Sequence, residues 1–124
     1  MVEFIKDRRR HQRINQNVPI KIFQEDGDIV TETSNVSEAG IYCKINKPLK
    51  LMTKLKVRLL LPVRKSNKVV TKQLSCQGII VRSEPAAKGH YDIAVFFNEL
   101  TAKEADVICD YVNCCLEQQS VNLS

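Results

Sequence analysis

The amino-acid sequence predicts a small, mainly β protein: an antiparallel barrel of six strands followed by one C-terminal helix. Short segments of alternating apolar and polar residues recur between residues 18 and 97. Polar segments, most of them containing Gly or Pro, separate them, and beyond residue 100 the apolar residues change to helical spacing. Several short strands followed by a helix favour a barrel with the helix packed on it or across its mouth.

The first three strands are expected at residues 18–22, 29–33 and 41–45. Apolar residues occupy every second position in the first and third of these segments, the period of a strand with one buried face. The second segment is rich in β-branched residues. An Asp-Gly pair between the first two favours a hairpin turn. The mostly polar residues 34–40 are expected to form a loop.

The other three strands are expected at residues 55–61, 69–82 and 90–97. Alternation is clearest in the first of them, and Pro62 is expected to close it. The second is long for a single strand, so we expect it to bend or bulge near Gly78.

A helix is predicted at residues 102–118. Thr101 and Glu104 have the spacing of a capping box, in which each residue accepts a hydrogen bond from the backbone of the other. The apolar residues behind them recur at helical spacing and form one stripe: Val107, Ile108, Tyr111, Val112, Cys115 and Leu116.

Length and composition indicate one globular domain. The chain has 124 residues, of which 44% are hydrophobic and 27% charged. No apolar run approaches the roughly 20 residues that a membrane-spanning helix needs, and the N-terminus has no apolar signal region. We therefore expect a soluble, cytoplasmic protein, divided into a flexible basic arm (1–13), a barrel with its helix (14–118) and a tail (119–124).

Positive charge is concentrated in the N-terminal arm. Five basic and two acidic residues lie in the first 13, so the arm carries +3 of the chain's net +5. Charge alone is compatible with a solvated terminus or with an arm that meets phosphate.

The sequence contains no recognisable catalytic motif, so we expect a binding protein and not an enzyme. The five cysteines include no Cys-x-x-Cys pair. On a helix, Cys109 and Cys114 would point about 140° apart, which does not suit a shared metal ion. We therefore expect no metal and no cofactor, and reduced thiols in the core.

Two motifs stand in a particular order along the chain. Arg9 and Arg13 form an Arg-x-x-x-Arg shortly before the first strand, and residues 35–40 form an Asn-x-Ser-x-x-Gly between the second and third strands. Together they resemble the signature of PilZ domains, the bacterial receptors for the second messenger cyclic di-GMP. The resemblance extends from about residue 7 to residue 115 and implies a PilZ-like barrel.

The resemblance also implies a ligand site. A cyclic dinucleotide offers two phosphates and two guanine bases, and the guanidinium fork matches phosphate oxygens as well as guanine O6 and N7. Asn35 suits a base edge, Ser37 adds a hydroxyl, and Gly40 allows a positive φ or a close backbone approach. The expected cyclic di-GMP ligands are Arg8, Arg9, Arg13, Asn35, Ser37 and Gly40.

The expected mechanism is that cyclic di-GMP orders the arm over the barrel and changes the surface presented to a partner protein. Two alternatives stay open. One is a PilZ-like adaptor that binds its partner protein without ligand. The other is a general nucleic-acid binder that uses the basic arm and has a steep salt dependence; binding of long nucleic acid is not the expectation.

Overall fold

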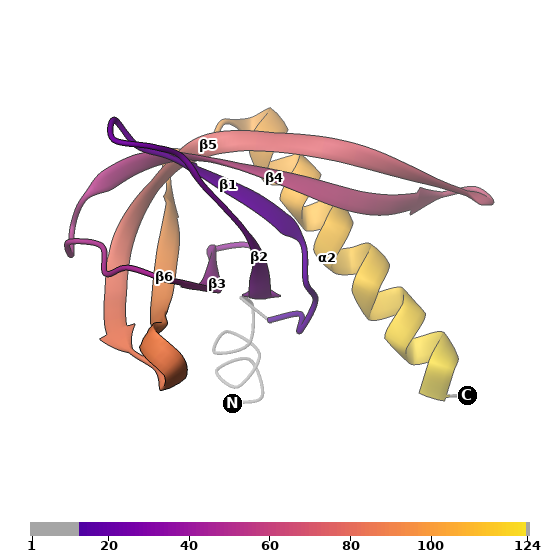
Figure 1. The fold of residues 1–124 in the computed structure, drawn as a ribbon. Coiled ribbons are helices and arrows are strands. Elements are labelled where there is room, and N and C mark those ends of the chain that lie inside the picture. The colour runs from indigo at the N-terminus through magenta and orange to yellow at the C-terminus, as the bar shows by residue number, and fades with distance from the viewer. Residues whose placement is uncertain (1–12, 124) are drawn as a thin grey trace, which may run out of the picture.

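The protein is a closed antiparallel barrel of six strands with a C-terminal helix (Figure 1). The computed structural model describes residues 13–123, with side chains to residue 117. The strand order around the barrel is β1-β2-β3-β6-β5-β4. The elements are β1 (Pro19–Phe23), β2 (Ile29–Val36), β3 (Gly40–Ile45), β4 (Lys54–Lys65), β5 (Lys68–Pro85), the short 3-10 helix η1 (Ala87–Gly89), β6 (Tyr91–Asn98) and α2 (Ala102–Leu123). The predicted fold class is confirmed.

The expectation that Pro62 closes the fourth strand is wrong. β4 continues to Lys65, and Pro62 pairs with Thr71 inside a long β4–β5 ribbon. The pairing of β4 with β1 stops at Leu59, so beyond that residue β4 has a neighbour on one side only. A proline is tolerated there because its missing N–H can face away from the ladder. In Figure 1 this ribbon projects beyond the barrel.

The long fifth strand is a single strand with a bulge close to the expected position. The register with β6 shifts between Ile80 and Arg82, a few residues beyond Gly78. Gly78 is required for a different reason, since a Cβ there would overlap the Val95 side chain. The bulge sits at Val81 and sets Arg82 opposite Ala94.

The helix α2 packs on β4 and β5 and contributes Ile108, Tyr111 and Val112 to the barrel core. Its start is the predicted capping box: the Thr101 N–H donates to Glu104 at 3.0 Å and the Glu104 N–H donates to the Thr101 hydroxyl at 3.1 Å. The helix runs on to Leu123, where a tail was expected from residue 119.

Candidate functional site

Arg13 is held against the barrel by the residue that follows it. Ile14 is 1% exposed and exchanges two backbone hydrogen bonds with Val36, at 2.7 and 2.9 Å. This bridge brings Arg13 beside the C-terminal end of β2, where its Nη1 donates a hydrogen bond of 2.8 Å to Asn35 Oδ1. The structure therefore joins the two sequence motifs through one contact.

An aromatic ring lies beneath the Arg13 guanidinium. Tyr42 pairs with Asn35 across β2 and β3, and the Arg13 Cζ lies 4.4 Å from the centre of the Tyr42 ring. That distance is typical of a cation–π contact, which stabilises by about 0.5–1 kcal/mol at an exposed site. Sequence reasoning missed Tyr42, although the alternation of residues 41–45 places its side chain on the outer face of the third strand.

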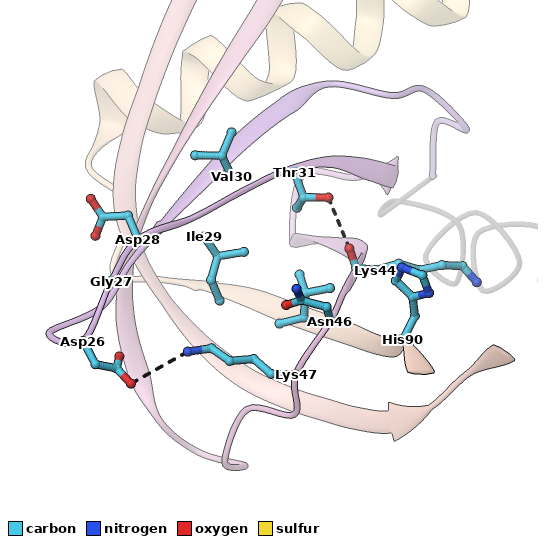
Figure 2. Close-up of a pocket in the computed structure, with 11 residues that line it drawn as sticks. Asp26, Gly27, Asp28, Ile29, Val30, Thr31, Lys44, Asn46, Lys47 and His90 are labelled. Carbon is cyan, nitrogen blue, oxygen red and sulfur yellow. Dashed lines mark hydrogen bonds and ion pairs between the residues drawn. The ribbon is translucent and has the colours of Figure 1, made fainter. Parts of the chain in front are cut away.

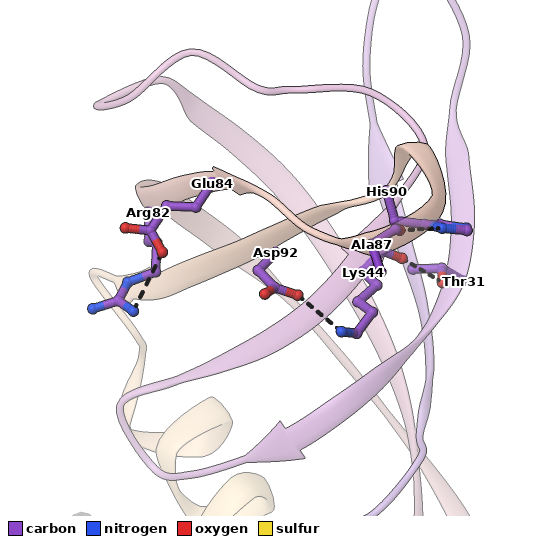
Figure 3. A network of polar contacts seen from close by, with 7 residues as sticks. All are labelled: Thr31, Lys44, Arg82, Glu84, Ala87, His90 and Asp92. Atoms are coloured by element: carbon purple, nitrogen blue, oxygen red, sulfur yellow. Dashed lines mark hydrogen bonds and ion pairs between the residues drawn. The ribbon is translucent and has the colours of Figure 1, made fainter.

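A second arginine, Arg82, approaches the Tyr42 ring from the β6 side, whereas Arg13 lies on the β2 side. Tyr42 pairs with Ala94 on β6, and Ala94 pairs with Arg82 on β5. The Arg82 Cζ lies 5.9 Å from the Tyr42 ring centre, and its Nη1 is 3.7 Å from Glu84 (Figure 3). We call Arg13, Asn35, Tyr42 and Arg82 the Tyr42 face.

The contact with Arg13 decides what Asn35 can offer to a ligand. Its Oδ1 is occupied by the guanidinium, so the amide N–H groups are the part left to donate. The Arg13 guanidinium carries five N–H donors in a planar fork, of which one is used for Asn35. This combination suits acceptors such as phosphate oxygens and the O6 and N7 atoms of guanine.

The Asn-x-Ser-x-x-Gly motif is less of a loop than expected. Asn35 lies inside β2, which extends to Val36, and Gly40 opens β3. Residues 37–39 alone make the turn. Asn35 is therefore positioned by strand pairing and not by a flexible connection.

Ser37 lies inside that turn and faces the protein. It is fully buried, and its hydroxyl accepts the N–H groups of Ala39 and Gly40 at 3.1 and 3.2 Å. The same hydroxyl lies 3.3 Å from the Gly40 carbonyl, to which it can donate. These contacts use the hydroxyl to hold the turn.

Gly40 is required because of a close backbone approach. A Cβ at this position would overlap the carbonyl oxygen of Val95 on the neighbouring strand. In the described residues the glycines with positive φ are Gly27 and Gly89, so Gly40 does not use a left-handed conformation. Of the two roles that the sequence allowed, the structure assigns the close approach.

The turn also lies near the helix. Burial, together with the nearby Glu38 carboxylate, raises the pKa of the Cys109 thiol of α2. Ala39 is bonded to β6 through its carbonyl, which accepts the Phe97 N–H at 2.8 Å. Residues 37–39 thus connect the Tyr42 face to α2.

Arg8 and Arg9 lie outside the described residues, so the structure places four of the six expected ligand residues. It brings Arg13 and Asn35 together at the surface. It assigns Ser37 and Gly40 to the architecture of the turn.

A separate hollow of about 510 Å³ lies at the other end of β2 and β3 (Figure 2). Its lining includes Asp26, Lys44, Lys47 and His90, and none of the four expected ligand residues that the structure describes. Lys47 lies 3.8 Å from Asp26, and Lys44 lies 3.2 Å from Asp92 (Figures 2 and 3). The lysines of this hollow are paired within the chain, so it is the weaker candidate for an anion site.

Between residues 13 and 123, no group of three or more His, Cys, Asp or Glu side chains could hold a metal ion. All five cysteines are free thiols. Within the same residues, no helix is both long and apolar enough to cross a bilayer.

Known proteins resemble this chain in fold and in sequence pattern. The fold is similar to the solved structure of the Bacillus subtilis inhibitor of motility (MotI/DgrA), with a TM-score of 0.73 and 18% sequence identity. The match covers 90% of this chain and 51% of that one, so the chain spans about half the length of that protein. No curated protein matches the chain. The model of the PilZ domain matches residues 7–113, and the chain therefore belongs to the PilZ domain family.

Proposed function

We propose that the protein is a receptor that binds cyclic di-GMP at the Tyr42 face without turning it over. The observation that carries the proposal is the position of Arg13, whose guanidinium lies over Tyr42 and is hydrogen bonded to Asn35. Membership of the PilZ family supports the choice of ligand.

The chemistry of the face suits a flat, doubly anionic ligand. One guanidinium–phosphate pair at about 4 Å gives roughly 4 kcal/mol of Coulomb energy at an effective dielectric near 20, before the costs of desolvation and ordering. Arg13 supplies one such pair and Arg9 of the arm a second. Asn35 donates to guanine, while the face of the Arg13 guanidinium that is turned away from Tyr42 offers a surface on which a base stacks.

Arg13 is fixed by contacts within the chain, so we assign the ordering step to the residues that precede it. Arg8 and Arg9 would close over a ligand that rests on Arg13 and Asn35. The signal would then pass through the turn of residues 37–39 to α2, because the Glu38 carboxylate is near enough to Cys109 to raise the pKa of its thiol. The partner protein would bind the altered surface of the arm or of the helix.

Titration calorimetry with cyclic di-GMP tests the proposal. The wild type should bind, and both Arg9→Ala and Arg13→Ala should weaken binding by at least about tenfold. Lys21→Ala is the matched control, because it also removes a cation that lies over an aromatic ring, on another wall of the barrel. Equal heats in all four proteins, or no heat in the wild type, would defeat the proposal; the second result would favour an adaptor that needs no ligand.

A further inference from the structure

Positive charge is segregated along the chain in a way that cyclic di-GMP does not explain. Residues 39–83 contain eleven Lys and Arg and no Asp or Glu. Some of these cations crowd one another: Lys65 lies close enough to Lys72 to lower its pKa. Three of the eleven pair with carboxylates from elsewhere in the chain: Lys44 with Asp92, Lys47 with Asp26 and Arg82 with Glu84. Where several cations gather with few such pairs, the surface is complementary to an anionic partner.

Two of these cations, Lys56 and Arg58, gather with Lys21 on the wall opposite β3 and β6, where β1 pairs with β4 (Figure 1). Lys21 Nζ, Lys56 Nζ and Arg58 Cζ lie 5.2, 5.8 and 5.1 Å from the centre of the Phe23 ring. Strand register imposes this cluster, because Phe23 pairs with Lys56 and Lys21 pairs with Arg58. Among the described residues, Asp28 is the carboxylate that neutralises one of the three, at 3.6 Å from Lys21.

An apolar groove adjoins the cluster. It has a volume of about 280 Å³ and is lined in part by Pro19, Val30 and Leu60, with Lys21 and Arg58 also on its lining. Val30 is 74% exposed and Leu60 is 39% exposed. We call the cluster together with this groove the Phe23 face.

We propose that the Phe23 face is a docking surface for an acidic segment of a partner protein, whose carboxylates pair with Lys21, Lys56 and Arg58 and whose apolar side chain enters the groove beside Val30 and Leu60. This surface goes beyond the dinucleotide site, shares no residue with it and needs no dinucleotide to form.

The geometry favours a protein segment over nucleic acid or a membrane. Three cations surround the one aromatic ring of this face, so the ring is poorly placed to stack on a base. The apolar part is a concave groove, which fits a single side chain better than the surface of a bilayer.

The test is fluorescence anisotropy with a short labelled peptide of glutamate and serine that has a central Leu-Leu pair. The wild type should bind it about tenfold more tightly than a matched peptide in which serine replaces both leucines. The double variant Lys56→Glu/Arg58→Glu should lose at least about tenfold in affinity. The control Lys50→Glu/Lys103→Glu changes the net charge equally at two exposed positions elsewhere and should bind within about twofold of the wild type.

A thermal melt establishes that each variant is folded. If Lys56→Glu/Arg58→Glu does not fold, Val30→Ser/Leu60→Ser leaves every charge in place and should lose the preference for the leucine peptide. The proposal is overturned if either folded variant binds as the wild type does, or if the wild type prefers a DNA duplex or phosphatidylserine vesicles to the peptide. Calorimetry with cyclic di-GMP is independent of this result, so the two proposals fail separately.

Discussion

The Tyr42 face and the Phe23 face are built alike, each with cations gathered over one aromatic ring on the outer wall of the barrel. They differ in what surrounds the ring. Arg13 at Tyr42 is oriented by the Asn35 amide, whereas the Phe23 cluster includes two flexible ammonium groups and an apolar groove. A planar fork with a fixed amide recognises a small ligand of defined geometry, while point charges beside a groove suit an extended acidic chain.

The largest effect should come from Gly40→Ala, which acts on the architecture of the Tyr42 face. A Cβ there overlaps the backbone of Val95, and the carbonyl oxygen cannot move without disturbing the ladder. We expect a loss of about 3 kcal/mol in the free energy of unfolding, measured by urea denaturation. Gly78→Ala meets a Val95 side chain instead and should cost less; the reverse order would contradict this account.

Arg13→Ala should reduce cyclic di-GMP affinity by about 10- to 100-fold, because a charge-assisted contact is lost. Arg13→Lys keeps the charge but not the planar fork, so it should restore the affinity in part only. Both variants should bind the leucine peptide as the wild type does. Calorimetry and anisotropy on the same protein samples separate the two faces, and a parallel loss of both activities would contradict their independence.

Ser37→Ala should lower the free energy of unfolding by about 2 kcal/mol, because two backbone N–H groups lose their acceptor in a buried turn. Cyclic di-GMP affinity of the folded protein should change by less than about threefold. Urea denaturation measures the loss of stability, and calorimetry measures the cyclic di-GMP affinity. A large loss of affinity with unchanged stability would mean that the hydroxyl contacts the ligand.

Tyr42→Leu should have the smallest effect, about two- to fivefold in cyclic di-GMP affinity, since it removes a cation–π contact from Arg13. Tyr42→Phe keeps the ring and should bind as the wild type does. Phe23→Leu is the corresponding change on the other face and should leave the calorimetric titration unaltered. If Phe23→Leu lost as much cyclic di-GMP affinity as Tyr42→Leu, the claim that the two faces bind different ligands would be contradicted.

Features with a local cause were predictable from the sequence. The approximate positions of the strands along the chain follow from residue alternation, and the start of α2 follows from the spacing of Thr101 and Glu104. The two motifs also locate Arg13 and Asn35, which the structure joins. These patterns act over a few residues, so a single sequence contains them.

Features that depend on strand register were not predictable. Pro62 is tolerated inside β4 because the pairing of β4 with β1 stops at Leu59, which is a property of the barrel and not of the segment. Arg82 reaches Tyr42 only because β5 bulges after Ile80. Likewise, the burial of Ser37 follows from how the turn folds back onto Gly40.

Amide chemical-shift mapping during a cyclic di-GMP titration tests the central claim most directly. The account predicts that the largest shifts fall on Asn35, Tyr42, Ala94 and Arg82, which lie in one row across four strands. Lys21, Phe23 and Lys56 on the opposite wall should not respond. Shifts centred on that wall, or none at saturating ligand, would contradict the account.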